Sequence, residues 1–235
     1  AKLNIFSMNG APIWEQLKIE EALLRADAEN WCIINTGSPP AIVMGISGKQ
    51  AELIDPVQLH KNRIPIIRRF SGGGTVVVDE STLFISFIFQ KQDLKIDHCP
   101  QSLLHWTGKL YEPVFSPLEV RVRENDYVVQ EKKVGGNAQY FTKTRLLHHT
   151  TFLWDYKQER MQLLQMPKKV PDYRQGRGHE EFVTTLKGHF SSMQEIKQRL
   201  FNELAKQFSV HERDASSIPE ILTRPHRKAL EIITS

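Results

Sequence analysis

The sequence predicts an α+β fold, with a mixed or mostly antiparallel sheet flanked by helices. Short segments rich in β-branched and aromatic side chains recur along the chain, which is typical of strands. Two longer segments, residues 14–26 and 192–208, repeat apolar residues every three or four positions and indicate amphipathic helices. No repeat, linker or break in composition divides the chain. We therefore expect residues 1–235 to form one domain, although the pattern weakens after about residue 211.

Turn and capping residues set the boundaries of the elements in the first half. The turn residues GSPP separate two apolar runs, so a strand is expected on either side of them. Asp55 is a favourable N-cap residue and Pro56 suits a first helical turn, which predicts a short helix there. The elements expected in this half are a helix at 14–26, strands at 31–37 and 40–47, a short helix at 55–61, and strands at 64–70, 76–78 and 83–89.

Alternation and apolar spacing organise the second half. Val120 and Val122 alternate with Arg121 and Arg123, as expected of an antiparallel hairpin. The elements expected here are a helix over part of 99–114, hairpin strands within 119–141, a strand at 144–156, a short helix at 161–165, a polar arginine-rich loop at 172–182, the helix at 192–208 and a helical segment at 219–233.

Composition and charge narrow the class of protein. The 235 residues are 40% hydrophobic and 25% charged, without a run of about 18 apolar residues, so we expect a soluble chain with no membrane span. The net charge of +4 comes from dispersed lysines and arginines, and we expect no nucleic-acid partner. Cys32 and Cys99 show no CxxC spacing and no secretory signal is visible. A cytoplasmic protein is expected, or an organellar one if a transit peptide has been removed.

Three consecutive glycines stand between an arginine pair and a β-branched run, in RRFSGGGTVVVD. Glycine permits positive φ angles and lets another molecule approach the backbone closely. The spacing matches neither a P-loop nor a GxGxxG fingerprint. Two interpretations are open: a tight β-turn or bulge beside surface charges, or a backbone cradle for a bound group with nearby cations for its negative end.

A second glycine pair and two adjacent histidines are the other candidate site residues. In KKVGGNAQ, Lys133 precedes a small-residue turn, where an ammonium group beside open backbone N–H groups can hold a phosphate. In LLHHTTFL, His148 and His149 would point to opposite faces of a strand. At most one of them faces a given pocket, so a metal-binding histidine pair is not expected.

Taken together, these motifs resemble a known family. RRFSGGGTV with a following aspartate, ENDYVV, KKVGGNAQ and LLHHTTFL occur in the order and spacing of the lipoate–protein ligase A family. The resemblance runs from about residue 5 to residue 208 and includes PAIVMGIS and DYRQGRGHEEF. It implies the catalytic-domain fold of biotin and lipoate protein ligases, which is class II synthetase-like. It also implies a short form without the accessory C-terminal domain, for which a separately encoded partner is one expectation.

The resemblance implies a two-step reaction. Such enzymes use ATP and Mg²⁺ to convert lipoate or octanoate to an acyl-AMP, with release of pyrophosphate. The acyl group then passes to a lysine of a lipoyl carrier domain. Carrier domains of this kind belong to the E2 subunits of 2-oxoacid dehydrogenases and to the H protein of glycine cleavage. Lipoyl-AMP is the expected intermediate when lipoate is the substrate.

The resemblance also assigns roles to residues. Lys133 matches the family's central lysine and would be catalytic, neutralising charge on the α-phosphate and the acyl oxygen. Asp126 would hold Mg²⁺ or orient the phosphates. The acyl and carboxylate site would comprise Arg69, Ser71, Gly72, Gly73, Gly74, Gly136, Ala138 and His149. The nucleotide site would comprise Asp79, Thr82, Asn125, Asp126 and Val134.

Purely structural explanations stand beside these roles. Lys133 also fits a solvated lysine at a strand end, and His149 an ordinary packed histidine. Asp126 follows an asparagine, and this pair is common in turns. Arg174 and Arg177 belong either to a loop that closes over the nucleotide or to ordinary surface charge.

The chain departs from the ligase pattern beside the glycines and in the histidine motif. The ligases carry a histidine-aspartate pair and then glycine-asparagine, where this chain has Val78, Asp79, Ser81 and Thr82. The histidine and asparagine are thus missing on the nucleotide side, which weakens the expectation of tight ATP binding. In the histidine motif, Thr150 replaces a glycine and narrows that position.

Other functions stay open at this stage. An octanoyl or lipoyl transferase would act without ATP; its thioester form needs a cysteine at the acyl pocket, and none stands at the expected positions. Direct lysine-assisted transfer is not affected by that argument. Biotin ligation is less favoured, because the glycine- and arginine-rich biotin loop is missing. A further alternative is a non-catalytic subunit that binds lipoate or a carrier domain for another enzyme.

Overall fold

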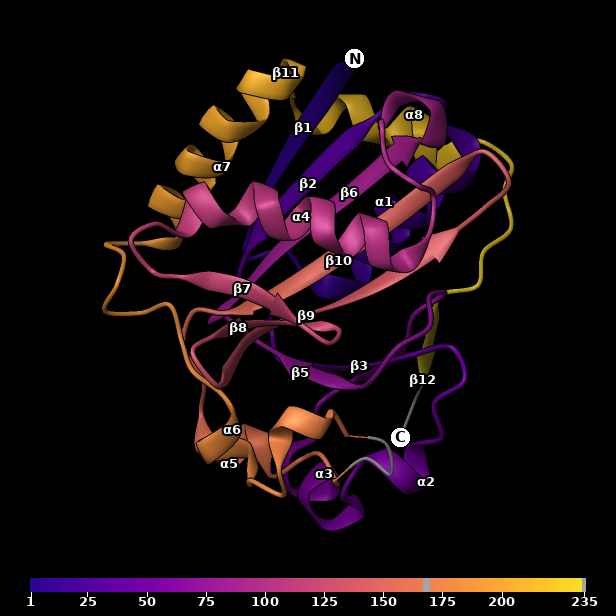
Figure 1. Cartoon of the computed structure of the whole chain (residues 1–235). Helices are drawn as coiled ribbons and strands as arrows, with labels where there is room; N and C mark the ends of the chain where they lie inside the picture. The colour runs from indigo at the N-terminus through magenta and orange to yellow at the C-terminus, as the bar shows by residue number, and fades with distance from the viewer. Residues whose placement is uncertain (167–169, 234–235) are drawn as a thin grey trace.

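The computed structural model describes residues 1–166 and 170–233, and its strands in these ranges form two sheets (Figure 1). The larger sheet has the strand order β11-β1-β2-β6-β10-β9-β8-β7, in which β1 runs parallel to β2 and β11 and the other pairs are antiparallel. Its strands are β1 Lys2–Asn9, β2 Trp31–Thr36, β6 Thr82–Gln90, β7 Val120–Arg123, β8 Asp126–Val129, β9 Lys132–Phe141, β10 Arg145–Leu153 and β11 Ser209–Arg213. The predicted mixed, mostly antiparallel sheet is confirmed.

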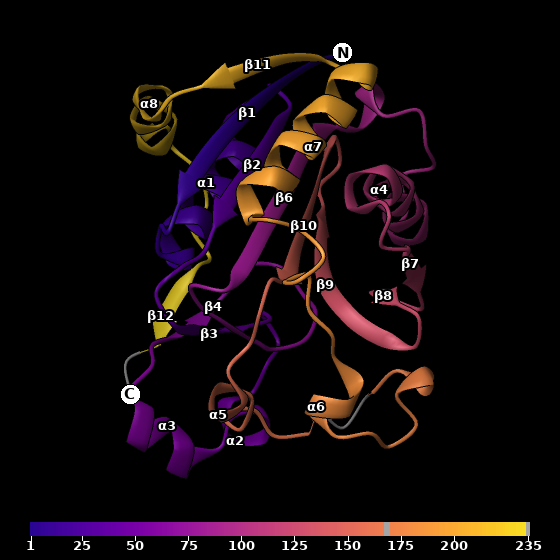
Figure 2. The same ribbon diagram turned by 90° about the vertical axis from the view of Figure 1, so that its left-hand side faces the viewer.

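Helices cover both faces of the larger sheet (Figure 2). Helices α1 (Ile13–Ala26) and α8 (Ile218–Thr223) pack on one face, and α4 (Pro100–Phe115) and α7 (Met193–Gln207) on the other. Alternation along the strands supplies the two cores, because successive side chains point to opposite faces. In β2, for example, Trp31 packs toward α1, whereas the next residue, Cys32, joins the core beneath α4 and α7.

A smaller sheet lies below the carboxyl end of β2, with the order β12-β4-β3-β5 (Figure 1). Its strands are β3 Ala41–Met44, β4 Ile66–Arg68, β5 Val76–Val78 and β12 Glu231–Ile233. Short helices gather at this end of the molecule: α2 Gln50–Leu53, α3 Pro56–Asn62, α5 Gln158–Met161 and α6 His179–Phe182. The predicted cap of α3 is confirmed, since the Asp55 side chain accepts from the backbone N–H groups of Val57 and Gln58. The glycine loop joins β4 to β5, so both ends of the loop are fixed by strands of this smaller sheet.

Three predicted elements are wrong in part. The short helix expected at 161–165 lies one turn earlier, as α5, and Leu164 instead forms a β-bridge with Ile54. The expected loop at 172–182 contains a 3₁₀ turn, η2 (Asp172–Arg174), and helix α6. The expected helical segment at 219–233 stops at Thr223 as α8, two residues before Pro225, and the chain ends its described part as β12. A proline disfavours helical geometry in the residue before it, which explains this stop.

The sequence reading also missed elements and shortened one. Strands β1 and β11 were not expected, although they pair in parallel at the edge of the larger sheet. Helix α4 extends over the whole of Pro100–Phe115 rather than over part of it. The two remaining 3₁₀ turns are η1 Lys91–Asp93 and η3 Ala215–Ser217. None of the helices in the described ranges is both long and apolar enough to cross a bilayer.

Candidate active site

One buried arginine gathers the carbonyl groups of the glycine loop. Arg69 is 5% exposed, and its Nη2 donates to the carbonyl oxygens of Gly72 at 2.7 Å and Gly74 at 2.8 Å. Burial lowers the pKa of Arg69 to about 10, while the Glu20 carboxylate opposes this shift, so the guanidinium stays charged at neutral pH. Arg69 therefore fixes the shape of the loop, which the sequence alone did not reveal.

Only the middle glycine of the loop is demanded by its immediate surroundings. Gly73 has φ +100°, and a Cβ there would lie 2.8 Å from Arg69 Nη2 and 3.3 Å from the Ala138 Cβ. A Cβ at Gly72 or Gly74 would meet nothing within 4 Å. The absence of side chains at these two positions thus has no packing explanation, and it leaves this part of the loop open to another molecule.

A buried relay of side chains joins the loop to helix α1. The Ser71 Oγ lies 2.9 Å from His149 Nε2, and His149 Nδ1 lies 2.9 Å from Glu20 Oε2. The other Glu20 oxygen accepts from Ser86 Oγ at 2.6 Å and from Gln16 Nε2 at 2.8 Å. A neutral imidazole with its hydrogen on Nδ1 accepts from Ser71 and donates to Glu20, which satisfies both contacts. The structure therefore brings two predicted site residues, Ser71 and His149, into direct contact.

Glu20 is a member of this relay that sequence reasoning missed. Its residue is fully buried, at 0% exposed, on the face of α1 that packs on the sheet. Leu17 and Leu24 are buried three residues before it and four residues after it. A carboxylate is costly to bury unless it is paired. The presence of an acidic residue within an apolar helix stripe was therefore the sequence signal that could have identified Glu20.

The adjacent histidines point to opposite faces, as predicted. His148 is fully buried on the α4 side, where its Nε2 lies 2.9 Å from the Tyr127 hydroxyl. That hydroxyl in turn lies 2.6 Å from Thr107 Oγ1. Burial lowers the pKa of His148 to about 3, so it is neutral at physiological pH. His148 is thus separated by the sheet from the glycine loop that His149 contacts.

Lys133 and Asp126 form an ion pair on neighbouring strands. Lys133 Nζ lies 2.7 Å from Asp126 Oδ1, and the Lys133 side chain is 30% exposed against 9% for the aspartate. The other Asp126 oxygen accepts from the Tyr173 hydroxyl at 2.8 Å. A Cβ at Gly136 would lie 3.2 Å from Lys133 Nζ, so this glycine keeps the ammonium accessible. The site is therefore a partly exposed ammonium group paired with a buried carboxylate.

The arginine-rich segment after α5 packs against this ion pair. Glu124 accepts from the backbone N–H groups of Asp172 and Tyr173, and the Thr184 N–H donates to the Lys133 carbonyl at 2.8 Å. Burial, followed by the Asp126 charge, raises the pKa of Tyr173, which therefore stays protonated and donates. Tyr173 is a second residue that the sequence reading did not assign to the site.

Asp79 and Thr82 lie together but are engaged with other protein groups. The Asp79 N–H donates to Thr82 Oγ1 at 3.0 Å, and both residues are buried. The Asp79 carboxylate is ion-paired with Arg160 of α5, which also pairs with Glu80 at 2.8 Å. Lys157 contacts Glu80 as well, at 2.6 Å. Arg160 is thus ion-paired with the carboxylate that the sequence analysis assigned to the nucleotide site. The local sequence does not predict this pairing.

Of the remaining predicted nucleotide residues, Asn125 directly precedes Asp126 and Val134 directly follows Lys133. Asn125 is exposed in the β7–β8 turn, where its carbonyl accepts from Asn137 Nδ2 at 2.7 Å. Val134 is fully buried in the core under α4, so only its backbone could contact a nucleotide. The predicted site residues therefore form three groups: the glycine loop with Ala138 and His149, the Lys133 group, and the Asp79 group.

A metal site is not preassembled among the described residues. No three of their histidine, cysteine, aspartate or glutamate side chains come together as a metal cluster. Magnesium does not require one, because it is commonly held by one or two carboxylates together with substrate phosphates and water. Asp126 fits that chemistry, since a carboxylate oxygen has a further lone pair after accepting one hydrogen bond.

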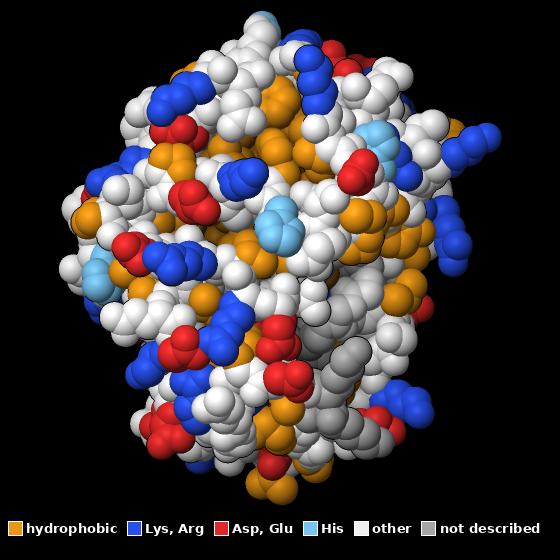
Figure 3. Space-filling model, in the orientation of Figure 1, with side chains coloured by type: hydrophobic (Ala, Val, Ile, Leu, Met, Phe, Trp, Pro, Cys, Tyr) orange, Lys and Arg blue, Asp and Glu red, His pale blue; other side chains and the backbone are white. Residues whose placement is uncertain are grey.

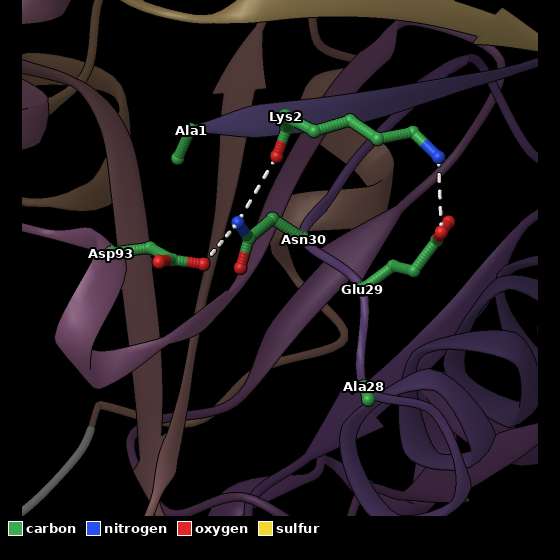
Figure 4. Close-up of a pocket in the computed structure, with 6 residues that line it drawn as sticks. All are labelled: Ala1, Lys2, Ala28, Glu29, Asn30 and Asp93. Atoms are coloured by element: carbon green, nitrogen blue, oxygen red, sulfur yellow. Dashed lines mark hydrogen bonds and ion pairs between the residues drawn. The ribbon is translucent and has the colours of Figure 1, made fainter.

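A surface cavity lies away from these groups. It measures about 200 Å³ and is lined by the N-terminal strand, the turn before β2 and Asp93 (Figure 4). Its polar side chains already pair with one another: Asn30 Nδ2 donates to Asp93, and Lys2 bonds Glu29 at 2.9 Å. On the face drawn in Figure 3, basic side chains are interspersed with acidic ones. Neither feature matches the chemistry expected at the predicted site.

Sequence comparison identifies the family of the chain. The model of the family described as "Lipoyl protein ligase A/B catalytic domain" matches residues 12–205. The inactive lipoate–protein ligase 2 of Plasmodium falciparum is 29% identical over 194 residues, covering 67% of this chain and 50% of that protein. The lipoate-protein ligase LplJ of Bacillus subtilis is 32% identical over 146 residues, covering 59% and 42%. The chain spans about half the length of these two relatives.

Solved structures share the fold. A bipartite lipoate protein ligase from Thermoplasma acidophilum, described with its E2 lipoyl domain, matches with a TM-score of 0.77 and 18% identity over 94% of this chain and 90% of that one. A lipoate-protein ligase A bound with ATP matches with a TM-score of 0.75 and 20% identity over 94% and 92%. The Thermoplasma acidophilum protein with bound lipoic acid matches with a TM-score of 0.76 and 17% identity, over the same two shares. These matches confirm the predicted lipoate-ligase fold.

Proposed function

The chain belongs to the family of lipoyl protein ligase A/B catalytic domains, and we propose from this premise that it is a lipoate–protein ligase. It would activate lipoate or octanoate with ATP and transfer the acyl group to a lysine of a lipoyl carrier domain. The related proteins named above include one bound with ATP, one with lipoic acid and one described with an E2 lipoyl domain. These ligands support the proposed substrates and the proposed partner.

The observation that carries the proposal is the Lys133–Asp126 ion pair. Asp126 holds the ammonium at 2.7 Å, and the lack of a side chain at Gly136, whose Cβ would lie 3.2 Å from Lys133 Nζ, leaves the ammonium uncrowded. A fixed cation of this kind stabilises negative charge that develops on an acyl oxygen or on a departing phosphate. Lys133 would therefore act in both half-reactions, first on the mixed anhydride as it forms and then as AMP leaves.

The glycine loop would supply the acyl side of the site. The open side of Gly72 and Gly74 would let an apolar chain lie along the backbone, with His149 and Ala138 as neighbouring walls. Each buried methylene contributes about 0.8 kcal/mol, so several together would provide on the order of 4–6 kcal/mol of binding. Arg69 would act here mainly by holding the loop in the shape that makes this contact.

Magnesium would enter on the nucleotide side through Asp126. When bound, the ion would neutralise phosphate charge, together with Lys133. Asn125 and the backbone at Val134 flank this position and would contact the nucleotide. Asp79 and Thr82 would join them only if the Arg160 contact opens.

A pyrophosphate-release assay with ATP, Mg²⁺ and lipoate tests the proposal. We expect lipoate-dependent release from the wild type and a decrease of at least about 100-fold for Lys133→Ala. Lys132→Ala is the matched control, because this neighbouring lysine is exposed on the same strand and should not affect the rate. Equal rates for the two variants would contradict the role of Lys133.

A second assay separates the half-reactions. Synthetic lipoyl-AMP and an isolated lipoyl carrier domain are supplied without ATP, and lipoylation is measured by intact mass. Transfer without pyrophosphate release would indicate a transferase step that needs a partner for activation. Neither reaction from the wild type would contradict the ligase proposal and favour a binding subunit.

The Arg160–Asp79 contact favours this partner-dependent or non-catalytic form as the second candidate. It removes a carboxylate from the nucleotide side in a chain that also lacks the family's histidine and asparagine there. One relative is itself named an inactive ligase. A transferase acting through a cysteine thioester has less support. Cys32 is buried on the face opposite the Ser71 relay, and burial raises the pKa of its thiol.

A further inference from the structure

Two buried side-chain nitrogens beside Lys133 have no partner among the residues that the structure describes. Arg174 is only 4% exposed, and its buried Nη2 has no acceptor within the described ranges. The buried Nε2 of His179, a donor in the tautomer that carries its hydrogen there, has no partner in these ranges either. Leaving a buried donor unpaired is unfavourable, more so for a charged group, so each such group calls for an explanation. The proposed function as stated above uses neither side chain.

The two donors lie on one side of the short helix α6. His179 and Phe182 are three residues apart and so share a helix face, and the Arg174 guanidinium lies over the Phe182 ring at 4.8 Å. Arg174 cannot swing freely, because its Nε donates to the Arg177 carbonyl at 2.9 Å and Arg177 Nε donates back to the Arg174 carbonyl at 3.0 Å. The unpaired Nη2 is therefore held in place rather than exposed by chance.

Lys133 lies on the same side. The segment that carries His179 continues into Val183, which bridges to Lys133 in the sheet. Burial lowers the pKa of His179, and the nearby positive charges of Arg174 and Lys133 lower it further. Arg174, His179 and Lys133 are thus close enough to interact electrostatically. The Asp126 carboxylate, which lies near Arg174, already accepts from Lys133 and from Tyr173.

We infer that Arg174, His179 and Lys133 form a binding site for a phosphoryl oxyanion. A phosphate group offers several acceptor oxygens, which would accept from Arg174 Nη2 and from His179 in its Nε2–H tautomer while the phosphate balances the excess positive charge. The inference rests on the proposed function, in which the α-phosphate of the acyl-adenylate or the released pyrophosphate would be the source. Free inorganic phosphate carries the same chemistry, and the experiment distinguishes these sources.

Calorimetric titration with AMP, pyrophosphate and inorganic phosphate as separate probes tests the site on the intact chain. We expect the wild type to bind AMP or pyrophosphate more tightly than phosphate. Arg174→Met and His179→Gln should each weaken that binding at least tenfold. Methionine keeps an apolar stem over Phe182 and removes the guanidinium, including the Nε that donates to the Arg177 carbonyl. The matched control is Arg121→Gln, which removes an exposed arginine of β7 and should bind all three probes like the wild type.

Thermal unfolding with and without ligand supplies the second measurement. If the unpaired Nη2 exists for a ligand, AMP or pyrophosphate should raise the unfolding temperature of the wild type and should not raise that of Arg174→Met. The variant loses the Nε bond to the Arg177 carbonyl with or without ligand, so an equal rise in the two proteins would overturn the inference. Wild-type protein that binds none of the probes, or variants that bind them unchanged, would overturn it as well.

The outcome is separable from that of the proposed function. Lipoate-dependent pyrophosphate release that requires Lys133, with probe binding unchanged in Arg174→Met and His179→Gln, would retain the ligase and reject the site. Probe binding lost in both variants, in a protein that neither activates nor transfers lipoate, would retain the site and reject the ligase.

Discussion

The glycine loop, which joins β4 to β5 of the smaller sheet, and the Lys133 group on β8 and β9 of the larger sheet differ in how completely their polar groups are paired. In the loop, Arg69, Ser71, His149 and Glu20 bond one another and the loop carbonyls through distances of 2.7–3.1 Å. Beside Lys133, Arg174 Nη2 and His179 Nε2 are buried without a partner in the part of the chain that the structure describes. The polar groups of the four residues at the loop are paired without a ligand, although the adjacent Thr75 Oγ1 and Gln16 Oε1 have no partner among the described residues. Stability should therefore depend mainly on the four paired residues, and phosphate binding on the Lys133 group.

Removing Glu20 should have the largest effect on stability. Glu20→Ala leaves His149, Ser86 and Gln16 without their common acceptor in a buried site, at a cost of about 3 kcal/mol in the free energy of unfolding. Glu20→Gln keeps one acceptor oxygen and should cost about 1 kcal/mol. Urea denaturation measures both.

An exposed acid of the same helix is the control for this prediction. Glu15→Ala should change the free energy of unfolding by less than about 0.5 kcal/mol. If Glu20→Ala behaves like Glu15→Ala, the relay does not hold the loop, and the contrast between the two regions is lost.

Much of the fold could be predicted from local patterns, whereas the partners of the site residues could not. Helix α1, the cap at Asp55 and the opposite facing of His148 and His149 follow from periodicity and propensity over a few residues. The contact between Ser71 and His149 joins positions 78 residues apart and depends on the register between strands. Local pattern carries no information about such a register.

The partners of Asp79 and Asp126 show the same limit of prediction from local sequence. Asp79 was recognised from a motif, but its partner Arg160 lies in a helix whose position was predicted one turn too late. Tyr173 lies in a segment that reads as polar and irregular, yet it is buried against Asp126. Both pairings are tertiary contacts that the local sequence does not determine. Such departures from local sequence preference are expected at functional sites.

The stability contributed by His148 should fall with acid. Its pKa is about 3 in the folded protein, against about 6.5 when unfolded, so the unfolded chain binds the extra proton between these values. The contribution is therefore present above about pH 6.5 and is lost as the pH falls toward 3, by up to about 1.4 kcal/mol for each pH unit. Urea denaturation of the wild type and His148→Gln at several pH values checks this.

Comparing these two proteins removes the effect of other titrating groups. Carboxylates also titrate below pH 5, but they do so in both proteins. The difference in unfolding free energy between wild type and His148→Gln should narrow or reverse from pH 6.5 downward. A difference that does not vary with pH would mean that His148 is protonated in the fold or exposed to water.

The smallest expected effect is the decrease in kcat on removal of the Tyr173 hydroxyl. It tests whether this hydroxyl acts on the reaction through Asp126 and Lys133. Tyr173→Phe removes the hydroxyl that holds Asp126 Oδ2, and Asp126 in turn positions Lys133. We expect kcat to fall about fivefold, or roughly 1 kcal/mol, with little change in KM for the acyl substrate. Tyr156→Phe, in the same partly buried cluster, is the control and should leave kcat unchanged.

A double-mutant cycle then decides whether the hydroxyl acts through the aspartate. If it does, Tyr173→Phe should have almost no additional effect once Asp126→Asn is present, because the two changes disrupt one pathway. Fully additive losses would mean that Tyr173 acts on the substrate directly or on the fold as a whole. Non-additive losses in kcat, with an unchanged free energy of unfolding in Tyr173→Phe, would make the docked 172–184 segment part of the Lys133 group. The segment that carries Arg174 and His179 would then also hold the lysine beside them in place.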